Sequence, residues 1–355
     1  MSAPDPILRL VRPEILALAP YSSARKEASG GRVWLDANEN PETPAKHRAW
    51  LNRYPDPQPA DLVAQLAELY GVTPANLLVT RGSDEGIDLL LRAFCRAGQD
   101  AILITPPTYG MYTVAAGIQN ARVVTVPLPR EQDFALDADA VIRTARADAS
   151  VKIVFLCSPN NPTGQLLARD AVLRVARELA ERAIVVVDEA YIDFAAQPSL
   201  ATELATTPNL IVLRTLSKAH GLAGARVGST IASPTVIGVL QKIIAPYPIP
   251  TPVLEAALAV LTPESLAATR ESVREIITER ARLAAELPKL RVVRHVWPSD
   301  ANYLLLAVDD AKRVMAAGHA AGIIWRDRSK DVPDTIRITI GTRAENDATL
   351  ATLAT

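Results

Sequence analysis

Cysteine and histidine are scarce in this sequence, and disulfide frameworks and zinc sites depend on them. Only Cys95 and Cys157 are cysteines among 355 residues, and each lies in an apolar segment. Two such residues do not make the framework that stabilises small secreted domains. The four histidines include no close pair of the kind found among zinc ligands. We therefore expect neither structural disulfides nor a metal site.

The sequence also lacks an excess of one charge, many aromatic residues and long apolar runs. Lysine and arginine number 38, aspartate and glutamate 39, so we expect neither nucleic acid nor a membrane surface as a partner. Aromatic residues make up 5% of the chain and offer no platform for stacked bases. The opening stretch MSAPDPILRLVRPEI mixes proline and charge into its apolar residues, and no later run reaches the roughly 18 residues of a membrane span. We expect a cytoplasmic enzyme.

Short β-branched runs alternate with helical patterns through the middle of the chain. Between two such runs, Ile87, Leu90, Leu91 and Phe94 recur at the spacing of one helix face. Continuous apolar strands flanked by helices predict an α/β fold, with a mainly parallel sheet covered by helices on both faces. Such sheets bind ligands beyond the carboxyl ends of their strands. The predicted strands are 76–80, 101–105, 121–126, 151–156, 183–188, 209–215 and 226–232.

A proline cluster at 246–252 interrupts this alternation, because each proline removes a backbone donor and disfavours helix at the residue before it. We place a domain boundary there, between a large domain of residues 46–250 and a smaller α+β domain of residues 251–355. Residues 1–45 are irregular and are expected to pack with the smaller domain. That domain is predicted to hold a long charged helix at about 263–287 and strands at RVVRHV, NYLLLAV, GIIW and TIRITI.

Lys218 follows an apolar strand and precedes a loop of small residues. A surface lysine is the ordinary interpretation of such a residue. At a water-poor strand end, however, desolvation disfavours the ammonium form, which lowers the pKa and frees the amine for Schiff-base chemistry. Other polar groups also follow predicted strand ends, where this fold gathers side chains into one cleft. They are Ser83, Asp84, Tyr109, Asn161, Asp188, Tyr191 and Ser217.

Asp188 ends an apolar strand. It could cap a helix or pair with a surface charge, but a carboxylate at a buried position needs a cationic partner. A protonated pyridine nitrogen would be such a partner, and the carboxylate would keep the ring an electron sink.

The sequence around Ser83 and Asp84 could cap the helix that follows, or its exposed N–H groups could take a phosphate. Ser217 and Arg226 could complete that phosphate site with a hydroxyl and a charge-assisted contact. Arg226 could equally be a solvated residue at a strand edge.

The segment SPNNPTG has the composition of a turn. Its Asn161, together with Tyr191, could also donate to a phenolate oxygen. Tyr109 could be a core aromatic or could offer its ring for stacking. A nucleophilic amine, an acid for a ring nitrogen, donors for a phenolate, a stacking face and a phosphate site are together the requirements of pyridoxal phosphate.

Ten segments of the chain resemble the fold-type I pyridoxal-phosphate aminotransferases, and more narrowly the histidinol-phosphate aminotransferase group. SPNNPTG and SKAHGLAGARVG are typical of the superfamily, whereas NENP, RYPD, GSDE and RITIGT in one chain favour the narrower group. The segments are LDANENP, RYPD, RGSDEGIDLLLRAF, PTYGMY, SPNNPTG, VVDEAYIDF, RTLSKAHGLAGARVG, SDANYLLL, WRDRS and IRITIGT.

The resemblance implies a role for each of these residues. Lys218 would carry the cofactor, Asp188 would meet its ring nitrogen, Asn161 and Tyr191 its 3-hydroxyl, and Tyr109 its ring face. Ser217, Arg226 and the backbone of Ser83 and Asp84 would bind the phosphate. Tyr54 would reach the cofactor phosphate of a neighbouring subunit, which implies a homodimer.

Arg337 would take the substrate α-carboxylate as a bidentate fork, or else be the exposed member of an alternating strand. Arg326 and Tyr21 would contact the substrate's distal phosphate.

The expected reaction is a transamination between L-histidinol phosphate and 2-oxoglutarate, giving imidazole-acetol phosphate and glutamate by ping-pong chemistry. Lys218 would shuttle the proton between the substrate and the cofactor. Three alternatives stay open: an aromatic-amino-acid aminotransferase of the same subgroup, a phosphothreonine decarboxylase, and a non-catalytic domain that binds the cofactor. The segment LAPYSSARKEASGGRVW departs most from the group's pattern, and it contributes to substrate choice.

Overall fold

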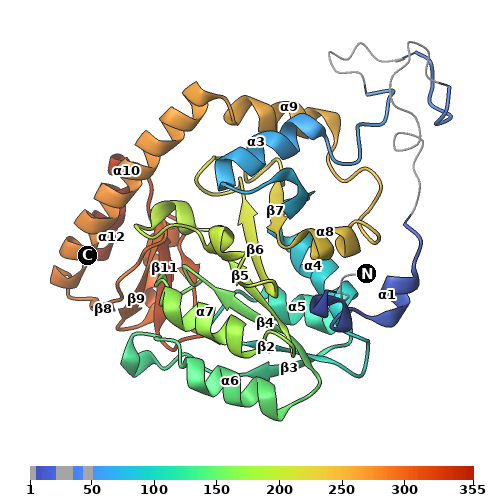
Figure 1. Ribbon diagram of the computed structural model, residues 1–355. Coiled ribbons are helices and arrows are strands. Elements are labelled where there is room, and N and C mark those ends of the chain that lie inside the picture. The colour runs from blue at the N-terminus through green and yellow to red at the C-terminus, as the bar shows by residue number, and fades with distance from the viewer. Residues whose placement is uncertain (1–4, 21–34, 43–50) are drawn as a thin grey trace.

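The computed structural model describes residues 5–20, 35–42 and 51–355, and a seven-stranded sheet crosses their centre (Figure 1). The strand order is β1-β7-β6-β5-β4-β2-β3; β7 pairs antiparallel with β1 and β6, and the other neighbouring strands are parallel. The prediction of a mainly parallel α/β sheet is confirmed. The strands are β1 (Leu77–Thr80), β2 (Ala101–Ile104), β3 (Arg122–Thr125), β4 (Val151–Cys157), β5 (Ile184–Asp188), β6 (Leu210–Thr215) and β7 (Gly228–Ile231).

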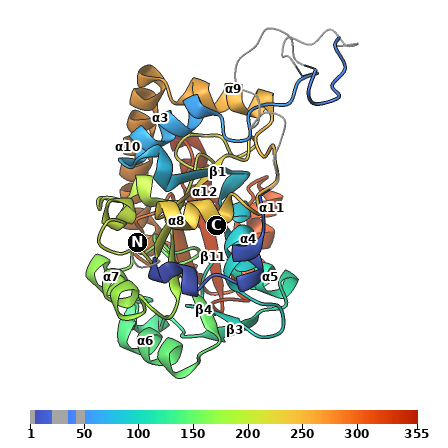
Figure 2. The same ribbon diagram turned by 45° about the vertical axis from the view of Figure 1, so that its right-hand side comes forward.

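Helices cover both faces of this sheet, because its central strands are apolar on both sides. Figure 2 shows α6 and α7 on one side and α4 and α5 on the other. One face carries α3 (Ala60–Tyr70), α6 (Ala138–Ala147), α7 (Arg169–Glu178) and α9 (Thr251–Val260). The other carries α4 (Gly82–Phe94), α5 (Met111–Ile118) and α8 (Pro234–Leu240).

The described start of the chain packs on the large sheet, which differs from the packing expected for it. Residues 5–20 form a short 3₁₀ helix, η1 (Pro6–Arg9), and α1 (Pro13–Ala17). Ile7, Leu10 and Val11 are buried in the same core as α4 and α8, and the Arg12 N–H donates to the Ala93 carbonyl at 3.0 Å. These apolar side chains therefore pack against α4 and α8 of the large domain. The domain boundaries at residues 45 and 250 stay a prediction.

The C-terminal part of the chain forms a second, antiparallel sheet in the order β10-β11-β9-β8. The segment GIIW, expected as a strand, lies between α11 and β10. Gly322 adopts a φ of 75° and the Ile323 N–H donates to the Gly318 carbonyl at 2.8 Å, so these residues close the end of the helix. The elements are α10 (Pro263–Glu286), β8 (Val293–Val296), β9 (Tyr303–Val308), α11 (Ala311–Ala320), β10 (Arg326–Asp327), β11 (Thr335–Thr339) and α12 (Arg343–Leu353).

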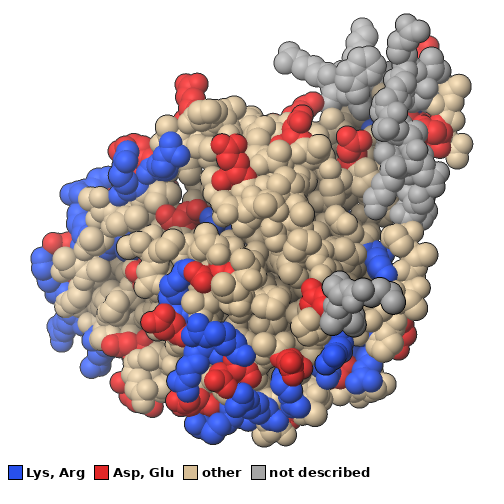
Figure 3. All heavy atoms as spheres, in the orientation of Figure 1, with Lys and Arg blue, Asp and Glu red and all other residues tan. Residues whose placement is uncertain are grey.

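Charged side chains of both signs interleave over α6 and α7 along the lower edge of Figure 3. Arg146 pairs there with Glu178, and Arg174 pairs with Asp139. Among the helices that the structure describes, none combines the length and the apolar character needed to cross a membrane.

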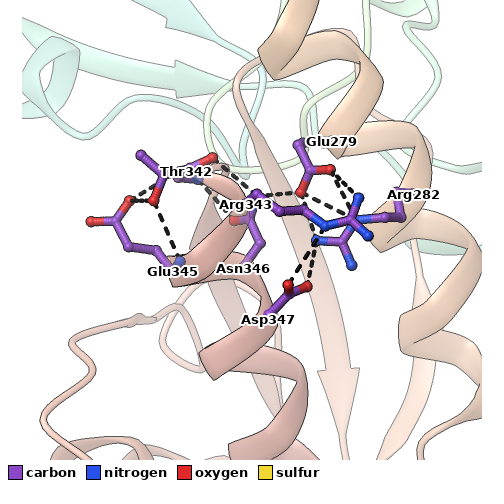
Figure 4. A network of polar contacts seen from close by, with 8 residues as sticks. Glu279, Arg282, Thr342, Arg343, Glu345, Asn346 and Asp347 are labelled. Carbon is purple, nitrogen blue, oxygen red and sulfur yellow. Dashed lines mark hydrogen bonds and ion pairs between the residues drawn. The ribbon is translucent and has the colours of Figure 1, made fainter.

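A network of polar contacts ties the start of α12 to α10 directly after β11 (Figure 4). Glu279 on α10 accepts from Arg282 at 2.6 Å, from Arg343 at 2.9 Å and from Asn346 at 2.9 Å. Thr342 and Glu345 form a capping box at the first turn of α12. The network therefore fixes the turn that follows β11.

Replacing Glu279 by glutamine should make the protein's melting temperature less dependent on pH below 4.5. Hydrogen bonds from Arg282 lower the pKa of Glu279 to about 2 from the ordinary value of 4.5. The carboxylate therefore stabilises the fold fully above pH 4.5, and this contribution is lost as the pH falls toward 2. Glu279→Gln should lower the melting temperature by about 2–4 °C at pH 7, and the gap to the wild type should narrow below pH 4.5.

Glu271→Gln is the matched control for this measurement. Glu271 lies on the same helix but, within the described part of the chain, its ion pair is with the exposed Arg274, and a pair of this kind contributes little. An equal loss from both substitutions at pH 7 would contradict the role given to the network.

Candidate active site

A cavity lies at the carboxyl ends of the central strands. Cys157 ends β4, Asp188 ends β5 and Thr215 ends β6, and all three line it. The position is the one expected for a ligand site of an open α/β sheet. The predicted residues that line the cavity are Ser83, Asp84, Tyr109, Asn161, Asp188, Tyr191, Ser217, Lys218, Arg226 and Arg337.

Lys218 projects from the loop after β6 into this cavity. The residue is exposed to the open cavity, yet protein atoms crowd its ammonium group, which lies 5.5 Å from the centre of the Tyr191 ring. Burial of this group, and then the positive charges of Arg337 and Arg226, lower the pKa of Lys218. A larger fraction of the amine is therefore neutral near pH 7 than in an ordinary lysine.

Asp188 is buried, with 2% of its surface exposed. Its Oδ2 accepts from the Tyr112 hydroxyl at 2.9 Å and its Oδ1 from the Ala190 N–H at 3.1 Å. Burial raises the pKa of this carboxyl to about 6. It caps no helix, since Tyr191 holds the N-cap position of the 3₁₀ turn that follows, η4 (Ile192–Phe194). The interpretations as a cap or a surface charge are therefore wrong.

Asn161 links two of the other predicted residues. Its Nδ2 lies 3.5 Å from the Tyr191 hydroxyl, and its Oδ1 accepts from Arg337 at 2.5 Å. Arg337 comes from β11 of the second sheet, and its guanidinium lies over the ring of Tyr303 at 5.1 Å. Desolvation raises the pKa of Tyr191, which keeps its hydroxyl protonated. The second sheet thus supplies a cation to a cavity formed mainly by the first.

The segment SPNNPTG is also the turn that its composition predicts. The Gly164 N–H donates to the Asn160 carbonyl at 2.7 Å, and Gly164 has a φ of 94°. Asn160 Nδ2 donates to the Pro107 carbonyl at 2.8 Å. These contacts fix the loop that carries Asn161.

A candidate anion site lies at the start of α4. Arg81 holds the N-cap position and no side chain caps this helix, so the interpretation of Ser83 or Asp84 as its cap is wrong. The first-turn N–H groups and the positive end of the helix dipole suit an anion. Arg226 donates to Ser217 at 3.3 Å and to Asp84 at 3.1 Å. Tyr109 donates to the same Asp84 carboxylate at 3.0 Å.

The backbone around this anion site is held in unusual conformations. Arg226 adopts a φ of 57°, in the left-handed region that non-glycine residues rarely occupy, and β7 begins only at Gly228. A Cβ on Gly228 would overlap the backbone of Gly82 and Ser83, so only glycine lets β7 approach α4 this closely.

Two of the predicted residues that the structure describes do not line the cavity. Tyr54 is 51% exposed and stacks on Tyr247 with ring centres 4.5 Å apart. Arg326 is exposed on β10, directly opposite Arg337 in the strand register. Tyr21 lies outside the described residues.

Four residues that line the cavity or lie beneath it were not predicted from the sequence: Tyr112, Cys157, Ala190 and Thr215. Tyr112 contacts Asp188, and Cys157 lines the cavity at the end of β4. The segment PTYGMY held a signal for Tyr112 in its second tyrosine, whose N–H donates to the Tyr109 carbonyl at 3.4 Å. Cys157 gave no signal beyond its apolar surroundings.

Comparison with known proteins agrees with this geometry. Residues 31–353 match the family model described as aminotransferase class I and II. The chain belongs to this family.

Two relatives of this aminotransferase match along nearly its whole length. A histidinol-phosphate aminotransferase of Stenotrophomonas maltophilia is 51% identical over 354 residues, which cover 99% of this chain and 97% of the relative. One of Xylella fastidiosa is 47% identical over 351 residues, 98% of this chain and 96% of the relative. The solved structure of a Sinorhizobium meliloti histidinol-phosphate aminotransferase in complex with pyridoxal-5'-phosphate has a TM-score of 0.77 and 26% identity, and the match covers 86% of this chain and 83% of that one.

Proposed function

We propose that this aminotransferase moves the amino group of L-histidinol phosphate to 2-oxoglutarate, giving imidazole-acetol phosphate and glutamate in histidine biosynthesis. Its cofactor is pyridoxal 5'-phosphate. The observation that carries the proposal is the 51% identity to a histidinol-phosphate aminotransferase over 99% of the chain. Amino-acid biosynthesis supports a cytoplasmic location.

The side chains of the cavity fit this cofactor. The amine of Lys218 suits its aldehyde, the buried carboxylate of Asp188 suits its ring nitrogen, and the first turn of α4 with Ser217 and Arg226 suits its phosphate. The hydroxyl of Tyr191 and the amide of Asn161 suit its 3-hydroxyl, and the ring of Tyr109 offers a stacking face. When bound, the cofactor supplies a ring that accepts the electron pair of the substrate Cα–H bond.

Each residue then has a physical task. Lys218 would bind the cofactor's aldehyde carbon, and its amine, when free, would move a proton at the substrate Cα. Asp188 holds the proton on the ring nitrogen. Arg337 binds the substrate's anionic group, which is a carboxylate in glutamate and a phosphate ester in histidinol phosphate, and a guanidinium fork suits both. We assign Arg326 and Tyr21 to the same substrate phosphate.

Gly228→Ala should weaken cofactor binding without touching any cofactor-binding side chain. The added methyl group would push β7 away from the backbone of Gly82 and Ser83, and overpacking of this kind costs about 1–3 kcal/mol. Relief of that strain would displace the Gly82–Ser83 backbone and distort the proposed phosphate site. The dissociation constant of the cofactor should therefore rise by about 10- to 100-fold. Fluorescence titration of the apoenzyme measures this directly.

Gly238→Ala serves as the control for that titration. Gly238 lies in α8, and a Cβ there would meet nothing within 4 Å. Unchanged affinity in Gly228→Ala would contradict the close approach as a requirement of the phosphate site.

We also propose a homodimer in which Tyr54 reaches the phosphate of the neighbouring subunit's cofactor. The half-exposed ring of Tyr54 and the apolar Val114 and Ile118, which are 50% and 75% exposed on α5, support this arrangement. Light scattering should give twice the chain mass of 38.1 kDa, and a monomer would contradict the proposal.

An absorbance titration tests the function. The protein is mixed with pyridoxal phosphate, and its visible band is followed as histidinol phosphate, phenylalanine or phosphothreonine is added. We expect histidinol phosphate to convert the band to that of the amine form of the cofactor, and 2-oxoglutarate to restore it. The other outcomes identify the alternatives. A response to phenylalanine alone would show an aromatic-amino-acid aminotransferase. Carbon dioxide released from phosphothreonine would show a decarboxylase. A band with no response to any substrate would favour a binding domain, and no band at all would overturn the cofactor assignment.

A further inference from the structure

Tyr112 on α5 is completely buried beneath the cavity and does not line it. Its ring stacks on Phe155 of β4 with centres 4.6 Å apart and meets the ring of Tyr109 edge-on at 5.6 Å. The two rings fix its orientation, and its hydroxyl contacts Asp188 Oδ2 at 2.9 Å. The hydroxyl is therefore held against the carboxylate that faces the cavity.

Tyr112 is the donor in this contact. Burial, and then the negative charge of Asp188, raise the pKa of Tyr112 well above its ordinary value, so its hydroxyl keeps its proton. The other carboxylate oxygen of Asp188 accepts from the Ala190 backbone. Among the described residues, one side chain and one backbone N–H thus donate hydrogen bonds to this carboxylate.

The charges around Asp188 do not offset the rise in its pKa that burial causes. Cys157, directly opposite in the register of β4 and β5, is a neutral thiol because burial raises its pKa. Asp84 on α4 raises the pKa of Asp188, whereas Lys218 after β6 and the hydrogen bonds from Tyr112 and Ala190 lower it. The Tyr112 hydroxyl thus stabilises the ionised carboxylate against the effect of burial.

We propose that Tyr112 is a positioning residue that keeps Asp188 ionised and aimed at the ring nitrogen of the bound cofactor, so that the nitrogen keeps its proton. The inference deepens the proposed function and rests on it. A carboxylate and a pyridine nitrogen share one proton, and a hydroxyl that donates to the carboxylate favours the arrangement with the proton on the nitrogen. Tyr112 touches neither cofactor nor substrate and acts only through Asp188.

The test compares the wild-type holoenzyme with Tyr112→Phe, in which phenylalanine keeps the ring stacked on Phe155. Both proteins are loaded with pyridoxal phosphate labelled with ¹⁵N at the ring nitrogen, and its chemical shift is read by NMR. We expect the protonated shift in the wild type and a displacement toward the neutral shift in the variant. Tyr70→Phe is the control, because it removes another buried tyrosine hydroxyl that does not line the cavity, and it should leave the shift unchanged.

A second measurement separates this role from general damage to the pocket. The affinity of each protein is measured for pyridoxal phosphate and for its analogue with a CH group in place of the ring nitrogen. Tyr112→Phe should weaken pyridoxal phosphate binding by about tenfold, the effect of a lost hydrogen bond to a charged group, and leave the analogue unaffected.

The outcomes distinguish the inference from the function beneath it. A protonated nitrogen in both proteins, or an equal loss of affinity for cofactor and analogue, would overturn the role of Tyr112 and leave the proposed function standing. A wild-type protein that binds no pyridoxal phosphate would overturn both.

Discussion

Lys218→Ala is expected to lower kcat by at least about 10⁴-fold, the upper end of what a positioned proton-transfer group contributes. The variant should still bind the cofactor, because Asp188, Ser217, Arg226 and the first turn of α4 remain. Its visible spectrum should be that of free pyridoxal phosphate, since no side-chain amine is left to bond the aldehyde. Stopped-flow absorbance with histidinol phosphate measures the remaining rate.

Small amines give this prediction a sharper test. Methylamine in the buffer should restore part of the rate, because it can enter the open cavity and move the proton in place of Lys218. The restored rate should rise with the concentration of neutral methylamine. Lys152→Ala is the control, since the Lys152 amine donates to the Ala149 carbonyl and does not line the cavity. A rate for Lys218→Ala within tenfold of the wild type would remove the lysine from the mechanism.

Asp188→Asn has the second largest expected effect. The substitution keeps the size of the side chain but removes the charge that faces the ring nitrogen. Removing one partner of a buried ion pair costs about 3–5 kcal/mol, which corresponds to about 10²- to 10⁴-fold in kcat. The ring nitrogen of the variant should be neutral, and single-turnover kinetics should place the loss in the proton-transfer step.

Glu189→Gln is the matched control for Asp188. Both carboxylates are 2% exposed and adjacent in sequence, but Glu189 accepts from Ser199 and from the Leu200 N–H and lies 4.0 Å from Arg214, away from the cavity. Its substitution should lower the melting temperature and change kcat little. An equal fall in kcat for both variants would show that kcat depends on the integrity of the end of β5 and not on the charge of Asp188.

The strands of the large sheet and the residues that meet at their ends were predictable because they depend on local order. An apolar β-branched run forms a buried strand wherever it lies in such a sheet, and parallel strands bring their carboxyl ends together. Asp188 at the end of β5 and Ser217 and Lys218 after β6 line one cavity for this reason. Their chemical roles are not fixed by that order, and they stay proposals.

What escaped prediction depends on contacts between distant segments. The direction of β7 follows from its pairing with β1 and β6, and the left-handed backbone of Arg226 shortens that strand at its start. Ile7 and Leu10 pack on α4 and α8 through apolar surfaces that no local pattern identifies. The contact of Tyr112 with Asp188 joins residues 76 apart in sequence. No window of neighbouring residues contains such information.

The source of Arg337 has an evolutionary consequence. The side chains proposed to hold the cofactor come from the large sheet and the loops and helices around it, whereas Arg337 comes from β11 of the second sheet. Given the proposed role of Arg337, mutations in β10, β11 and the turn before α12 would change which substrate anion is bound and leave the cofactor-binding side chains in place. New substrate preferences can arise in such a molecule without passing through variants that have lost their cofactor.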